Sequence, residues 1–403
     1  LVSAGRRALA GGDLRAAQSL LDRAIELLPR GDSTRLAVLP ELAYALTEGG
    51  AFDRAREIVS EAAECGDERI EAHARIELLR ARLQGTSEGF EAHAEELDEL
   101  ERTFERLGDD PGLARVLFVR AISDRWNRAR ARETAELLRR AREHARRAGD
   151  TRLEGDATRW LYVASAFGPD RPEDVLREIE ALLAAGPGRM IEAAALNARG
   201  AFELMQGRVD DARSSLDRAI AMSRELGFAV QAAAIDSHGR ASIDEIAGDL
   251  DAAAERHEAA MRELERMGEK GYLSTVAGML ANVRYARGEY DEAERLARLA
   301  EEAAAPDDLA SQIQLRTARA QVLARRGRFE EGEATAREAI ALAEETDFLQ
   351  MHGHAYLALA EVLRVSGRRD EARTAVEAAL ALYERKGDVV GAQRARALLT
   401  ACN

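Results

Sequence analysis

Two histidines separated by one residue, His352 and His354, are the residues of this sequence with the clearest potential for chemistry, because imidazole is a common metal ligand. Side chains two residues apart on a helix point to different faces, and the sequence indicates no further ligand for this pair. Cys65 is more simply a small residue at a helix end than a reactive thiol. Gly268–Tyr272, the nearest Gly-rich segment, lacks the spacing of a phosphate-binding loop.

The many carboxylates do not single out an acid–base pair. Next to Arg at helical spacing they are typical of solvated ion pairs, and any two of them could be mistaken for a catalytic dyad. We therefore assign no catalytic residue, no metal and no cofactor, and we expect a protein that is not an enzyme.

A repeated glycine-and-alanine pattern indicates the elements that would position any binding residue. A Gly is followed five residues later by a small residue in seven places: Gly12/Ala17, Gly50/Ala55, Gly207/Ala212, Gly248/Ala253, Gly288/Ala293, Gly327/Gly332 and Gly367/Ala372. The last four spacings are 41, 40, 39 and 40 residues. The long gap after Gly50 has room for three degenerate copies, near Gly85, Ala129 and Gly168. The sequence thus predicts ten units of about 40 residues.

Small residues at two further positions predict how the helices of a unit pack. They stand seven residues before the turn Gly, at Gly5, Ala43, Gly200, Ala241, Ala281, Ala320 and Ala360. They also stand twelve residues after it, at Ala24, Ala62, Ala219, Ala260, Ala300, Ala339 and Ala379. Two antiparallel helices can approach closely where side chains are small. We expect the Gly to end helix A in a left-handed conformation and the acidic residue after it to cap helix B.

This triple spacing resembles the tetratricopeptide repeat (TPR), with units longer than the usual ~34 residues and without the family's helix-A tryptophan. The resemblance implies an all-α fold, a right-handed superhelical α-solenoid of about ten antiparallel helix pairs. We expect a single solenoid over residues 1–403, with a capping helix over 388–403. The prolines and glycines of residues 166–190 indicate a weak joint.

The resemblance also implies which helix-A side chains face the concave groove. Applied to this chain, it selects as binding residues Arg75, Arg82, Ser123, Trp126, Asn127, Thr158, Tyr162, Asn197, His238, Asn282, Tyr285, Gln314, Gln321 and His354. The same positions include Ser165, Met205, Glu245, Arg325 and Glu361. Amide and aromatic side chains of this kind can hold a peptide backbone or a polar ligand. The simpler interpretation of any one of them is a solvated groove residue.

Charge and composition exclude several classes of partner. With 58 Lys and Arg against 73 Asp and Glu, the net charge of -15 argues against direct nucleic-acid binding and against anionic membranes. No apolar run approaches the roughly 20 residues of a membrane span. Cys65 and Cys402 lie far apart in the sequence, so we expect no disulfide and a cytoplasmic protein.

One segment runs against the overall charge. Residues Arg125–Arg147 contain nine Arg and three Glu. This segment could dock an acidic partner. The simpler alternative is a solvated convex helix face.

Three further segments, residues 5–17, 39–46 and 382–388, resemble the C-terminal TPR regions of bacterial class III adenylate/guanylate cyclases with a central ATPase and of large LuxR-type ATP-dependent regulators. The start at Leu1 and the scarcity of Lys lead us to expect a fragment of a longer bacterial protein. The resemblance implies a regulatory or sensor arm in signalling, with upstream ATPase, cyclase or DNA-binding output domains as partners.

Three functions remain open. The first is a protein-interaction scaffold that binds a peptide or protein in the groove. The second is a small-molecule sensor, which a closed superhelix with Trp126, Tyr162 and Tyr285 facing inward would favour. The third, an enzyme, has the least support.

Overall fold

The computed structural model describes residues 1–85, 90–304 and 307–401, which are helical apart from the short turns and loops between helices. Consecutive helices pair into units, each with a helix A and a helix B. The A helices of units 1 to 10 are α1 (Val2–Ala10), α3 (Ser33–Glu48), α5 (Glu68–Gly85), α7 (Asp110–Arg120), α9 (Thr151–Phe167), α11 (Arg189–Met205), α13 (Ala229–Ile235) continued by α14 (Ala241–Ala247), α16 (Gly271–Ala286), α18 (Leu309–Arg325) and α20 (Leu349–Val365).

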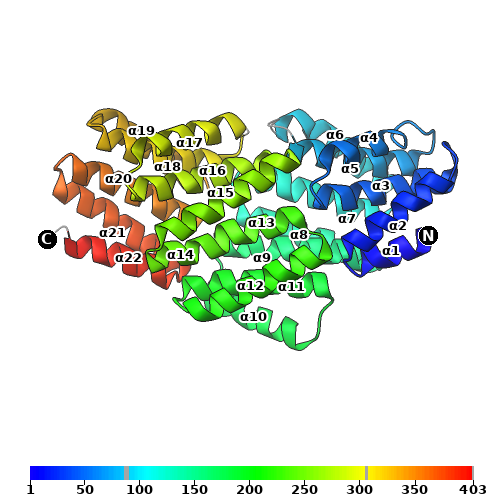
Figure 1. Ribbon diagram of the computed structural model, residues 1–403, viewed down its shortest axis with the longest axis horizontal. Coiled ribbons are helices and arrows are strands. Elements are labelled where there is room, and N and C mark those ends of the chain that lie inside the picture. Colours follow the sequence, from blue (N-terminus) through cyan, green and yellow to red (C-terminus); the bar gives the residue numbers. More distant parts are fainter. Residues whose placement is uncertain (86–89, 305–306, 402–403) are drawn as a thin grey trace.

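The B helices follow in the same order. They are α2 (Leu14–Leu27), α4 (Phe52–Ser60), α6 (Ala94–Leu107), α8 (Ala131–Ala148), α10 (Pro172–Ala184), α12 (Val209–Leu226), α15 (Leu250–Met267), α17 (Tyr290–Ala303), α19 (Phe329–Glu344) and α21 (Arg369–Lys386). A last helix, α22 (Val389–Ala401), packs on α21. Short 3-10 and π-helical segments cover Phe90–His93, Ala121–Arg125 and Asp236–Arg240. The described chain is thus an all-α, TPR-like solenoid of helix pairs, as predicted, and its ends lie at opposite ends of the long axis (Figure 1).

The turn glycines have the backbone conformation that the sequence predicts. The seven clear copies all have positive φ, between 76° and 84°, a region that only Gly occupies without strain. Ala129 has φ of 52° and is the only non-Gly residue with positive φ among the described residues. Two of the degenerate turns differ: Gly85 is the last residue of α5, and Gly168 has φ of -74°. The predicted left-handed conformation therefore occurs at Ala129 but not at Gly85 or Gly168.

The small residues of the repeat are buried where helices A and B of a unit meet. Ala17, Ala55, Ala212 and Ala293 are completely buried. A methyl group added at Gly200 would lie 2.6 Å from Leu216 Cγ on the facing helix. Such close approach explains why the repeat carries alanine or glycine at these positions.

The solenoid is wound so tightly that units five places apart touch. The Lys270 N–H donates to the Gln84 carbonyl at 3.1 Å, which joins unit 8 to unit 3. The Leu309 N–H donates to the Asn127 carbonyl at 2.7 Å, which joins unit 9 to unit 4. Lys386 Nζ, from unit 10, donates at 2.7 Å to three carbonyls of unit 5, those of Ser165, Gly168 and Asp170. The superhelix is therefore closed, with one turn stacked on the next.

Candidate functional site

Trp126, one of the predicted groove residues, lies in an aromatic cluster between two superhelical turns. Its ring centroid is 5.4 Å from that of Trp160, 5.2 Å from that of Phe167 and 4.8 Å from that of Phe348. Phe348 precedes α20, so it reaches unit 4 from unit 10. Aromatic pairs at these separations attract one another beyond the burial of their surface. The face of unit 4 around Trp126 is thus covered by the following turn.

The residue before Phe348 anchors the same junction. The Asp347 carboxylate accepts hydrogen bonds from the N–H groups of Ala131 at 2.6 Å and of Arg132 at 3.0 Å. These are the first two residues of α8, whose free N–H groups and helix dipole favour an anion. Asn127, another predicted groove residue, contributes the carbonyl that accepts from Leu309.

Several predicted groove residues bond within their own unit. The hydroxyls of Ser123 and Thr158 donate to the carbonyl four residues earlier in the same helix, at 2.6 Å and 2.8 Å. Arg75 pairs with Glu99 on α6, at 3.0 Å. These bonds use the single donor of each hydroxyl, and both side chains are buried, so neither hydroxyl is open to a ligand from solvent.

The two predicted histidines, His238 and His354, differ in their surroundings. Burial, and to a smaller extent His257, lower the pKa of His238 to about 4, and its ring lies 5.0 Å from Tyr272. The His354 side chain, by contrast, is exposed to solvent. Among the described residues no three His, Cys, Asp or Glu side chains gather in a way that could hold a metal ion.

Three residues selected by the groove positions meet on units 8, 9 and 10. Arg325 Nε donates to the Tyr285 hydroxyl at 3.0 Å, and that hydroxyl donates to Glu361 Oε1 at 3.0 Å. Arg325 and Glu361 are also an ion pair at 2.5 Å. Burial raises the pKa of Tyr285 to about 12, so the hydroxyl stays protonated. We call Tyr285, Arg325 and Glu361 the polar row; it crosses three successive A helices and is accessible to solvent.

The remaining predicted groove residues are neither fully buried nor fully exposed. They are Arg82, Tyr162, Asn197, Asn282, Gln314 and Gln321. Tyr162 packs beside the apolar cluster around Ile179 and Phe202. Their role in binding stays a prediction.

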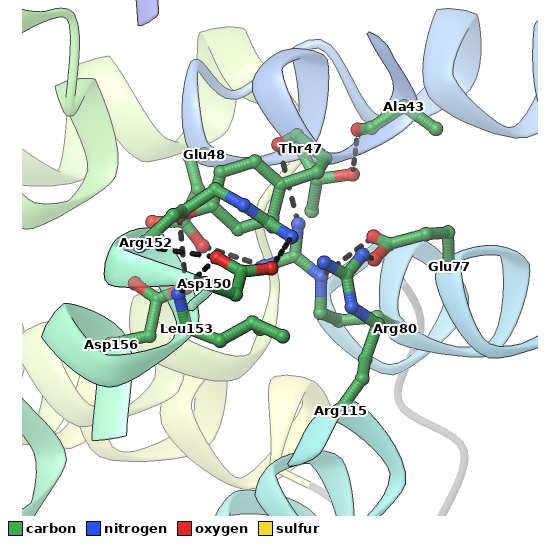
Figure 2. A network of polar contacts seen from close by, with 11 residues as sticks. Ala43, Thr47, Glu48, Glu77, Arg80, Arg115, Asp150, Arg152, Leu153 and Asp156 are labelled. Atoms are coloured by element: carbon green, nitrogen blue, oxygen red, sulfur yellow. Dashed lines mark hydrogen bonds and ion pairs between the residues drawn. The ribbon is translucent and has the colours of Figure 1, made fainter. Parts of the chain in front are cut away.

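A buried network of charges around Tyr44 is the feature that the groove list misses. The Tyr44 hydroxyl donates to Asp156 Oδ2 at 2.9 Å. The guanidinium carbons of Arg152, Arg80 and Arg115 lie 4.1, 4.7 and 5.6 Å from the centroid of its ring. Tyr44 belongs to α3, and Figure 2 shows the side chains of Arg80 from α5, Arg115 from α7 and Arg152 and Asp156 from α9 converging. The A helices of units 2 to 5 thus share one polar interior.

Carboxylates match the arginines of this network. Arg80 pairs with Glu48 at 2.6 Å and with Glu77 at 3.1 Å, and it donates to the Tyr44 carbonyl at 3.2 Å (Figure 2). Glu77, which is fully buried, also pairs with Arg115. The remaining pairs join Arg159 to Glu48 and Asp156 and join Arg152 to Asp150. Four arginines and four carboxylates leave the network without net charge.

Burial dominates the titration of the network. It raises the pKa of Tyr44 well above the usual range, with Asp156 and Glu48 adding to the effect. Burial also lowers the pKa of Arg115 to about 9, helped by the like charge of Arg152. For Glu48, burial opposes ionisation, but Arg159 and Arg80 outweigh it and lower the pKa. The network holds four helices together rather than offering a free charge.

A sequence signal for this network does exist in unit 2. Tyr44 and Glu48 stand six and two residues before Gly50, the positions that Glu361 and Arg325 occupy before Gly367 and Gly327, but the predicted list begins at unit 3. In units 3 to 5 the turns are degenerate, so the positions counted from Gly85, Ala129 and Gly168 do not include Arg80, Arg115 or Arg152.

Comparison with known proteins adds solved structures of similar fold. No family model and no curated protein matches the sequence. The chain is similar to yeast Tom70 at 16% identity over 98% of this chain and 86% of that chain, with a TM-score of 0.38. It is similar to the APC/C hetero-tetramer Cut9–Hcn1 at 12% identity over 99% and 88%, with a TM-score of 0.46. A Rap protein complexed with competence and sporulation factor gives 14% identity over 92% and 98%, with a TM-score of 0.42. Likeness at this level carries no inference about function.

Within the described ranges, no helix combines the length and the apolar character needed to cross a bilayer.

Proposed function

We propose that this chain is a non-catalytic interaction scaffold that binds a peptide or protein partner along the concave side of units 8 to 10. The polar row carries this proposal. It presents a phenol, a guanidinium and a carboxylate across three successive A helices, so one extended segment can contact all three. An open hollow of about 570 Å³ lies beside it, lined by Tyr290 and Arg326 among others. The Tyr285 and Tyr290 rings are 5.5 Å apart.

The interior of the first turn supports the same choice of surface. Around Tyr44 the paired charges are buried, and three aromatic rings pack against the ring of Trp126. A small-molecule sensor would need room beside inward-facing rings such as Trp126. The accessible surface of units 8 to 10 therefore favours the scaffold.

Photocrosslinking in the native host tests the proposal. A photoreactive amino acid replaces Gln321, beside the polar row, or Arg298, an exposed residue on helix B of unit 8 that serves as the matched control. We expect a discrete adduct from position 321, its loss when Arg325→Ala is added, and none from position 298. Absence of adducts from positions 282, 314 and 321 alike would rule out a partner on this face.

The finer part of the proposal is that the scaffold is the regulatory arm of a larger bacterial signalling protein. The resemblance of residues 5–17, 39–46 and 382–388 to cyclase-associated and LuxR-type regulators supports it. Sequencing the native gene upstream of Leu1 tests it directly. ATPase, cyclase or DNA-binding coding sequence is the expected result, and an immediate start codon would leave a free-standing adaptor.

A further inference from the structure

The junction between superhelical turns joins two different edges of the solenoid. One edge consists of the turns between helices A and B in the first superhelical turn. The other consists of the loops that lead from a helix B to the next helix A in the second. A methyl group added at Gly12, in an A-to-B turn, would lie 3.0 Å from Met190 Cβ near the start of α11, and one at Gly50 would meet Met267 at the end of α15. Loops of the second superhelical turn thus sit on A-to-B turns of the first.

The A-to-B turns of units 7 to 10 form the same kind of edge, but nothing covers them. The A helices of units 8 and 9 begin at the junction, where Lys270 and Leu309 donate to carbonyls of units 3 and 4, and they run away from it. Their A-to-B turns therefore lie on the far side of the second superhelical turn. Within the described chain, no neighbouring atom lies within 4 Å of a methyl group built at the glycines of these turns, Gly248, Gly288, Gly327 and Gly367. We call these four turns the turn edge.

The loops that follow helix B in units 1 to 4 form the opposite edge, and it is also free. In the part of the chain that the structure describes, no neighbouring atom lies within 4 Å of a methyl group built at the glycines of these loops, Gly31, Gly66, Gly108 and Gly149. Two of their counterparts in the second superhelical turn are covered by the first. A methyl group at Gly227 would lie 3.0 Å from Arg15 Cγ, and one at Gly387 would lie 3.2 Å from Pro172 Cδ. We call the four free loops the loop edge.

Exposed apolar side chains lie on both free edges. Ile246 stands beside the A-to-B turn of unit 7 and Phe329 beside that of unit 9, and they are 44% and 39% exposed. Leu27, the last residue of α2, is 75% exposed next to the first loop of the loop edge. Removal of such side chains from water favours association. Both edges therefore gain from being covered, as their counterparts inside the chain are.

The two free edges lie toward opposite ends of the molecule. Helix α1 begins near one end of the long axis, and α22, which starts beside unit 6 at the junction, ends near the other (Figure 1). Because the units repeat one helix pair, the loop edge of one copy has the form that A-to-B turns already accept within the chain. A second copy placed on the turn edge would continue the existing stack.

We propose that the turn edge is a docking site for the loop edge of a second copy of this chain, so that copies associate head to tail. The contact repeats between molecules the junction that the chain makes within itself. Its two surfaces differ, so the interface is heterologous, and a pair of copies still has one free edge of each kind. Association therefore continues beyond the dimer as the concentration rises.

Sedimentation velocity of the full chain across the micromolar range measures this association. The turn-edge variant is Ile246→Lys/Phe329→Lys, and the loop-edge variant is Leu27→Lys. The matched control is Arg298→Gln, an exposed position on helix B of unit 8 that belongs to neither edge. Circular dichroism checks that each variant is folded.

We expect the unmodified chain and Arg298→Gln to form dimers and longer species as the concentration rises. Each edge variant should associate at least about tenfold more weakly, because a charged group replaces an apolar one in the contact. A chain that stays monomeric at millimolar concentration would overturn the proposal. So would a dimer that grows no further, or an edge variant that associates as strongly as the unmodified chain.

A mixture of the two edge variants separates a head-to-tail contact from a symmetric one. The turn-edge variant keeps an intact loop edge, and the loop-edge variant keeps an intact turn edge. At a concentration where each variant alone is monomeric, the mixture should form a dimer of one copy of each and nothing longer. Absence of this mixed dimer would contradict a head-to-tail interface.

Partner binding at the polar row is tested separately. Leu27→Lys changes unit 1 and leaves units 8 to 10 intact, so the adduct of position 321 with a different protein should persist in this variant. Either proposal can therefore fail alone.

Discussion

The A helices of unit 2 and of units 9 and 10 place polar side chains at the same repeat positions but in opposite surroundings. Tyr44 and Glu361 both stand six residues before the turn Gly, and Glu48 and Arg325 both stand two residues before it. Tyr44 is 2% exposed against 19% for the side chain of Glu361, and the side chain of Glu48 is 8% exposed against 34% for that of Arg325. Repeat position therefore sets the direction of a side chain, and the surrounding units decide whether it is buried.

The largest effect that this comparison predicts is at Arg80. Arg80→Met would leave Glu48 and Glu77 buried without their shared partner, so we expect the free energy of unfolding to fall by about 3–5 kcal/mol. Urea denaturation followed by circular dichroism measures the change. A loss below about 1 kcal/mol would mean that the network relaxes or admits water, and the contrast with the polar row would disappear.

Phe348→Leu probes the junction between turns. The substitution keeps an apolar side chain but removes the ring contacts with Trp126 and Phe167, at an expected cost of about 1–2 kcal/mol. Hydrogen exchange should quicken in the first turn of α8, where Asp347 is seated. Phe104, a buried residue of α6, packs in a cluster formed by units 3 and 4 and provides the matched control. Phe104→Leu should leave hydrogen exchange in the first turn of α8 unchanged. Equally faster hydrogen exchange in the first turn of α8 in both variants would show that the junction does not open independently of the rest of the fold.

Glu269 gives the junction between units 3 and 8 a pH dependence. Burial raises its pKa to about 8 from 4.5, against the opposing effect of backbone hydrogen bonds. Between these values the folded chain keeps a proton that the unfolded chain releases, so the stability that it contributes is full below pH 4.5 and is lost as pH rises through 8. Urea denaturation between pH 5 and pH 8.5 should show the unmodified protein losing stability relative to Glu269→Gln. A constant difference across this range would show that Glu269 stays ionised when folded.

The smallest effect is expected in the polar row. Arg325→Met removes a solvent-accessible ion pair with Glu361, so the free energy of unfolding should change by less than about 1 kcal/mol. Glu361 keeps a second partner, Arg364, at 2.8 Å. The denaturation experiment used for Arg80→Met measures both variants side by side. If Arg325→Met lowered the free energy of unfolding as much as Arg80→Met, the polar row would be part of the stabilising interior of the fold and not a binding surface.

The repeat was predictable because its cause is local. A left-handed turn needs Gly and close helices need small side chains, and both leave a mark at fixed spacing, as at Gly200 and Gly207. Helix capping was predicted only in part. Asp13 and Asp249 accept hydrogen bonds at the start of helix B as expected, but Arg208 and Arg328 occupy the same position in other units without such a bond.

The closure of the superhelix could not be predicted from the repeat. It depends on the small rotation between neighbouring units, which sums over five or six units before Lys386 meets the carbonyls after α9 or Asp347 meets α8. For the same reason Trp126 was predicted to face the groove without any sign that Phe348 would cover it. Long-range contacts of this kind have no spacing rule in the sequence.

The stacking of units five places apart also constrains how the array can change in length. In an open solenoid, gain or loss of one repeat alters only the two neighbours at the cut. Here, deletion of one unit between units 5 and 9 would shift every later partner by one place. Asp347 would then face the helix of a different unit rather than the first N–H groups of α8. The contacts between turns thus fix the number of repeats in each turn, and viable length variants should gain or lose units beyond the stacked region.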